Sequence, residues 1–144
     1  HINILSLDDL LFFKEGQINL SCMRLSSYTL KTEVKISIGE PKIEHAFDLA
    51  NENNSIVIEC KNYTWTKAGN VPSAKVSTIN EAVLYFSFLD ANVRKILCLK
   101  KSVHPKRQET LAEYYVGTYG HLLRDITVYE IDNDKKLKKL FPTP

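Results

Sequence analysis

The sequence predicts an α/β domain in which a mixed β-sheet of about five strands is flanked by helices. Two observations support this class. Short apolar runs alternate with segments of helical spacing, in the order helix, three strands, helix, strand, helix, strand. The 144 residues, 44% hydrophobic and 25% charged, also have the size and composition of one folded domain. We therefore expect residues 1–144 to form a single domain with helices on the faces of its sheet.

Helices are expected in the N-terminal segment, residues 1–32. Residues 7–14, LDDLLFFK, carry two aspartates near a helix start, where negative charge suits the helix dipole. Residues 18–31 carry leucines and a methionine partly on one face and predict a second helix.

Five segments are predicted to be strands. EVKISI alternates apolar and polar residues, as a half-buried strand does, and residues 43–50 and 55–63 are each short and apolar enough for the centre of a sheet. The expected strands are residues 33–38, 43–50, 55–63, 93–100 and 125–131. The first three form a meander, and the later ones continue as βαβ crossovers.

Two further helices are predicted between the later strands. The first runs from residue 73 to about 89 with Ser73 as its cap, and the second runs from about 107 to 122. The charged tail, residues 132–144, is expected to hold at most a helical turn. The core of the domain is thus predicted at residues 33–131.

Bulk properties exclude some classes of function. The formal net charge of +2 is too small to indicate a polyanion partner by itself. The three cysteines lack metal-ligand spacing, which favours buried free thiols of a cytoplasmic protein over a disulfide or zinc site. No apolar run approaches the roughly 20 residues of a membrane span. Since no glycine-rich nucleotide loop occurs, we also expect no nucleotide cofactor.

Charged residues inside two apolar runs form the main candidate site. Asp48 ends one run, and the triplet Glu59, Cys60 and Lys61 ends the next; buried charges need a partner or a metal. Glu59 and Lys61 share one strand face, and Cys60 points away from it. If the two strands pair, both carboxylates and the main-chain carbonyl of Cys60 are oxygen ligands of the kind that Mg²⁺ prefers. Spacing alone fits a metal site and a structural ion pair of Lys61 equally well.

The pattern of acidic residue, any residue, lysine occurs four times, so the pattern itself is weak evidence. The copies that begin at Glu33, Glu40 and Asp134 lie in polar or turn-rich sequence, where solvated charges are the simpler interpretation. Only the copy that begins at Glu59 ends an apolar strand and has an aspartate 11 positions earlier (59 − 48).

The order FDL, polar turn, IVIECK, helix, strand, helix resembles the core of the restriction-endonuclease-like, PD-(D/E)xK, nuclease superfamily over residues 33–131. The resemblance implies that Asp48 and Glu59 bind a divalent metal and that Lys61 assists the chemistry. Mg²⁺ is the implied cofactor, and Mn²⁺ can substitute for it. Phe47 stands where the family pattern has a proline, a position that varies in the family.

The activity implied is that of a metal-dependent DNA endonuclease of the restriction or DNA-processing type. We expect a homodimer or a larger parent protein, because cutting a duplex usually needs two sites. A non-catalytic nucleic-acid-binding module of the same fold and a nuclease for RNA or branched DNA are the alternatives. The helical glutamate of many family members matches no position cleanly. Glu44 is a local substitute for it, although a solvated edge charge is favoured there, and His45 is expected to be packed rather than catalytic.

The loop TWTKAGNVPSAK follows the triplet directly and leads into a predicted helix N-terminus. Free N–H groups and the helix dipole suit phosphate contact at such a place. The alternative is a plain connecting loop in which Trp65 is a packing plug. The candidates for DNA contact are Lys67, Asn70, Ser73 and Lys75.

Overall fold

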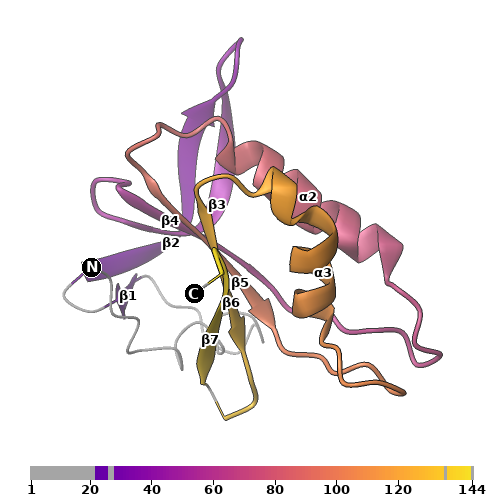
Figure 1. Ribbon diagram of the computed structural model, residues 1–144. Helices are drawn as coiled ribbons and strands as arrows, with labels where there is room; N and C mark the ends of the chain where they lie inside the picture. The colour runs from indigo at the N-terminus through magenta and orange to yellow at the C-terminus, as the bar shows by residue number, and fades with distance from the viewer. Residues whose placement is uncertain (1–21, 26–27, 135, 144) are drawn as a thin grey trace.

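Seven strands form one mixed sheet, in which each strand lies beside its neighbour in sequence. The structure is a computed structural model that describes residues 22–25, 28–134 and 136–143 (Figure 1). The strands are β1 (Cys22–Leu25), β2 (Tyr28–Ile38), β3 (Ile43–Asn51), β4 (Ile56–Lys61), β5 (Arg94–Lys100), β6 (Ile126–Ile131) and β7 (Leu137–Phe141). The helices are α2 (Ser73–Phe86), α3 (Leu111–Tyr119) and the 3-10 turn η1 (Gly120–Leu122).

The predicted α/β class and mixed sheet are confirmed. β1 to β4 pair antiparallel as a meander, β4, β5 and β6 are parallel, and β7 returns antiparallel to β6. All five expected strands are present, and β1 and β7 add two that were not expected. None of the helices in the described residues has the length and hydropathy of a membrane span.

Two predictions about the chain ends are wrong. The helix expected at residues 18–31 is contradicted by β1 and β2, which pair from Cys22↔Lys31 to Leu25↔Tyr28. The tail forms β7 rather than a helical turn, because Leu140 and Phe141 pack beside β6 against the core. In both cases pairing with a neighbouring strand outweighs a weak local preference. The helix expected at residues 7–14 lies outside the described residues.

The two helices differ in how their N-termini are capped. α2 begins at Ser73, so the expectation of a Ser73 cap is wrong; Pro72 occupies the N-cap position and offers no side-chain acceptor. α3 begins later than predicted, after Thr110. The Thr110 hydroxyl accepts from the N–H of Glu113, whose carboxylate accepts from the N–H of Thr110, which is a capping box.

Each face of the sheet carries its own buried cluster. Both α2 and α3 cover the same face, on the right in Figure 1, and they pack with the sheet residues Phe47, Val57, Leu97 and Val128. The opposite face buries Leu49, Ile58, Cys60 and Cys98. Both cysteines are buried, and Cys98 is a free thiol, as predicted for it.

A change of alternation in β2 and β3 positions the candidate site. Phe47 packs in the cluster under the helices, whereas Leu49, two residues later, packs in the cluster on the opposite face. A regular strand would place both on one face. Asp48 lies at this point, between the register pairs Thr32↔Leu49 and Val34↔Phe47. On β2, Glu33 lies between the same two pairs, and its φ of 53° departs from extended backbone. Because the alternation of side chains changes here, the side chain of Asp48 is directed toward β4, where it accepts from the N–H of Cys60.

Candidate functional site

Asp48 and Glu59 meet where the ladder between β3 and β4 stops. The last ladder pair toward this end is Leu49↔Ile58. Beyond it, the N–H of Cys60 donates to Asp48 Oδ2 at 2.8 Å, and the N–H of Asp48 donates to Glu59 Oε1 at 3.0 Å. The two carboxylates therefore accept from backbone groups that would otherwise bond to the opposite strand, and they lie side by side in the gap between the strands.

Lys61 completes the predicted set. Its Nζ lies 3.9 Å from Glu59 Oε2, and its side chain is 19% exposed, against 6% for Glu59. Cys60 turns its side chain to the opposite face, as predicted. Because the N–H and C=O of one strand residue point toward the same neighbouring strand, the carbonyl of Cys60 lies on the edge that faces Asp48. The four residues named from the sequence are thus brought together.

The pKa of the Glu59 carboxyl group departs from its ordinary value. The pKa of Glu59 is raised to about 7, first by burial and then by the charge of Asp48, while the N–H of Asp48 and the charge of Lys61 oppose the rise. Two carboxylates that share a buried site repel each other, so one tends to keep its proton. A cation between them would remove this cost. Oxygen donors from Asp48, Glu59 and Cys60 fit a hard divalent ion, although the described residues form no cluster of three or more acidic, His or Cys ligands.

His45 and α2 form one wall beside the carboxylates. The His45 ring stacks on Tyr85 with centroids 3.7 Å apart and meets Phe47 edge-on at 4.6 Å. Burial lowers the pKa of His45; the charges of Glu81 and Asp48 oppose this, and that of Lys61 adds to it. The expectation of a packed histidine is confirmed.

Glu81 is a residue that the sequence interpretation missed. It precedes Tyr85 by four residues on α2 and so lies on the same helix face, and its charge acts on the His45 ring that stacks on Tyr85. The signal was present in the sequence, since helical spacing relates the two positions. It could not be used until α2 was known to pack over β3.

The loop after β4 separates into a buried anchor and exposed polar residues. Trp65 is buried and packs edge-on against His104 and Tyr114, so the packing interpretation of Trp65 is confirmed. Lys67, Asn70, Ser73 and Lys75 are exposed. Their contact with DNA stays a prediction.

The loop that carries His104 contacts the loop after β4. His104 is buried, its Nε2 lies 2.9 Å from the carbonyl of Gly69, and its Nδ1 accepts from the N–H of Lys106. With Nδ1 accepting, Nε2 is the nitrogen that donates to the Gly69 carbonyl. Gly69 has a φ of 83°, and a Cβ there would lie 2.8 Å from His104 Nε2, so only glycine fits.

The other three acidic-x-lysine copies are solvated, as the sequence indicated. Their first residues, Glu33, Glu40 and Asp134, are exposed, as are the lysines that follow. Glu44 is also exposed, which agrees with a solvated edge charge.

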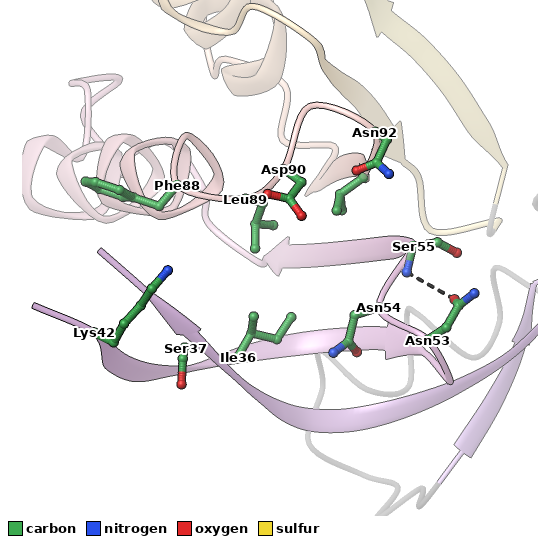
Figure 2. A pocket seen from close by; sticks show the side chains of 11 residues that line it. Ile36, Ser37, Lys42, Asn53, Asn54, Ser55, Phe88, Leu89, Asp90 and Asn92 are labelled. Carbon is green, nitrogen blue, oxygen red and sulfur yellow. Dashed lines mark hydrogen bonds between the residues drawn. The ribbon is translucent and has the colours of Figure 1, made fainter. Parts of the chain in front are cut away.

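A cavity in the described residues lies away from the carboxylates. Figure 2 shows this cavity of about 420 Å³, with the Asn53–Ser55 turn on one side and Phe88 to Asn92 on the other. Ser55 precedes β4 and Lys61 ends it, so the two places are about 20 Å apart at the usual rise of a strand. The cavity lining contains one carboxylate, Asp90, and no acidic pair. The charge cluster is therefore the stronger candidate for chemistry.

Comparison with known proteins identifies no relative. No protein-family model matches the chain, and neither the curated proteins nor the solved structures contain a match.

Proposed function

We propose that this protein is a divalent-metal-dependent nuclease that hydrolyses phosphodiester bonds in DNA. The observation that carries the proposal is the convergence of Asp48, Glu59 and Lys61, from two strands, at the point where the β3–β4 ladder opens. Of the four acidic-x-lysine copies, this is the one whose acidic residue is buried.

Asp48 and Glu59 are the proposed metal ligands, together with the main-chain carbonyl of Cys60. A bound Mg²⁺ or Mn²⁺ supplies charge neutralisation on the phosphate and a water of lowered pKa. The raised pKa of Glu59 supports this assignment, because a carboxyl group that resists ionisation beside Asp48 gains most from a neighbouring cation.

Lys61 is proposed to act on the substrate side of the site. Its ammonium lies beside Glu59 Oε2 and is the more exposed partner of that pair. From there it can donate to a phosphate oxygen or to the attacking water, and its positive charge stabilises the extra negative charge of the pentavalent phosphate.

The loop between β4 and α2 is the proposed DNA contact. Ser73 and Lys75 lie in the first turn of α2, whose N-terminus has no side-chain cap, and Lys67 and Asn70 are exposed in the loop before it. N–H groups and lysines at such a terminus favour a phosphate backbone. A homodimer would supply the second site for cutting both strands of a duplex.

The first test is cleavage of plasmid, single-stranded and branched DNA with Mg²⁺, with Mn²⁺ and with EDTA. We expect metal-dependent cleavage by the wild-type protein and its loss in Asp48→Asn. Asp134→Asn is the matched control, because Asp134 begins an exposed copy of the same pattern. Salt-sensitive DNA binding without any metal-dependent cleavage would instead support the non-catalytic module.

A further inference from the structure

A second groove, of about 280 Å³, lies between the β2–β3 hairpin and the end of α2. We call it the aromatic groove. Its main lining residues are Pro41, Ile43, Glu44, His45, Tyr85 and Phe88. Ile43 and Phe88 are 68% and 53% exposed, which is unusual for side chains of this size, so the groove presents apolar surface to solvent.

The aromatic groove adjoins the candidate site. His45 is three residues before Asp48 on the same strand, about 10 Å away at the usual rise. The charges of Asp48 and Lys61 both act on the His45 ring. A ligand in the groove is therefore next to a phosphate held at the carboxylates and not at a separate part of the surface.

The lining defines the chemistry of the occupant. No lysine or arginine lines the groove, and its carboxylate belongs to Glu44, so an anion is disfavoured there. Aromatic and apolar side chains suit a flat apolar body, and a carboxylate accepts from an amino group, as acidic side chains do with cytosine. The volume lies just below the usual range for drug-sized ligands, which limits the occupant to about one small ring system.

We propose that the aromatic groove binds one nucleobase of the strand whose phosphodiester lies at Asp48 and Glu59. This rests on the proposed nuclease function and names its substrate class. A base inside a duplex is paired and stacked and cannot enter a side-chain groove unless it leaves the helix. The preferred substrate therefore carries unpaired nucleotides beside the scissile phosphate, in a single strand, a branch or a flipped-out base.

The test measures binding without cleavage, by fluorescence anisotropy in EDTA. Two labelled strands of equal length are compared, one of deoxyadenylates and one of abasic deoxyribose phosphates. The base-bearing strand should bind about tenfold more tightly, and Tyr85→Leu and Phe88→Ala should each remove most of that difference. Neither variant should change the affinity for the abasic strand. Leu84→Ala is the matched control, since Leu84 is 57% exposed near the end of α2 but does not line the groove.

Phe88→Ala keeps the test valid if Tyr85→Leu disturbs the packing of His45, because Phe88 lies beyond the end of α2 and is largely exposed. Equal affinity for the two strands, or no effect of either variant, would overturn the proposal. If the wild-type protein cleaves DNA but binds both strands equally, the groove proposal is wrong and the nuclease proposal stands. If it binds the base-bearing strand more tightly but cleaves no DNA, the nuclease proposal is wrong and base binding by the groove stands.

Discussion

Two charged clusters in this protein, each with one buried member, differ in how completely their charges are compensated. Lys95 on β5 is 3% exposed, and its Nζ donates to Asp125 Oδ2 at 2.6 Å and to the carbonyls of Asp90 and Val93 at 3.1 and 3.3 Å. The bond from Lys95 holds the pKa of Asp125 below its ordinary value. Three acceptors for three ammonium hydrogens leave this charge fully satisfied.

The cluster of Asp48, Glu59 and Lys61 is not satisfied in this way. Two carboxylates face each other, the lysine is 3.9 Å away, and the pKa of Glu59 is raised instead of lowered. The carboxyl groups also differ in burial, since the side chain of Glu59 is 6% exposed and that of Asp125 is 52% exposed. Burial and a second carboxylate raise the pKa of Glu59, whereas a close hydrogen bond from Lys95 lowers that of Asp125.

The largest expected difference is in catalysis. Lys61→Met should lower metal-dependent cleavage by at least about 100-fold, because it removes a donor that acts on the developing charge. Its free energy of unfolding in urea should change by less than about 1 kcal/mol, since the partner lies at 3.9 Å. Lys136→Met, in an exposed copy of the pattern, should retain activity. If Lys61→Met lost stability and kept activity, the contrast between the clusters would disappear.

The pH dependence of stability should separate the clusters next. The Glu59 carboxyl ionises near its ordinary value of 4.5 in the unfolded chain and near 7 in the folded one. Between these values the folded state binds more protons, so the free energy of unfolding falls as pH rises, by up to about 3 kcal/mol. Glu59→Gln should lack this loss and gain stability relative to wild type from pH 4.5 to 7.

Asp125→Asn is the comparison for that titration, with the opposite sign. The lowered pKa of Asp125 means that its contribution is present above the ordinary value of 3.8 and is lost as the pH falls. The stability difference between wild type and Asp125→Asn should therefore shrink in acid. Parallel pH profiles for Glu59→Gln and wild type would show that Glu59 is not held protonated.

Divalent metal should stabilise one cluster only. Mg²⁺ or Mn²⁺ at one hundred times its Kd should add about 2.7 kcal/mol to the free energy of unfolding, because only the folded protein holds both ligands in place. Thermal unfolding with and without metal measures this. Asp48→Asn should abolish the gain, and Asp125→Asn should keep it. If Asp48→Asn were still stabilised by the metal, the metal would bind at another site.

A smaller loss of stability is expected from the closed cluster. Lys95→Met should lower the free energy of unfolding by about 2 kcal/mol, because the hydrogen bonds from its ammonium to the carbonyls of Asp90 and Val93 and to Asp125 are lost. The cost stays moderate since Asp125 is half-exposed and returns to solvent. Cleavage by the folded fraction should be unchanged. Urea unfolding and cleavage of the same preparation would check both statements.

The sequence alone determined the α/β class, the strands of the core and the identity of Asp48, Glu59 and Lys61 as the unusual charges. These features depend on the period of apolar residues and on charges within apolar runs, which are local properties of the chain. For the same reason the three exposed acidic-x-lysine copies were recognisable without a structure.

Tertiary structure decided what depends on a partner far along the chain. β1 and β7 are strands because a neighbouring strand pairs with them, not because their own residues prefer it. Asp48 reaches Glu59 because the alternation of β3 changes at that residue, which no period in the sequence shows. The aromatic groove forms, and Glu81 comes near His45, only when α2 packs over β3. The sequence shows which residues share a helix face but not which strand that face contacts.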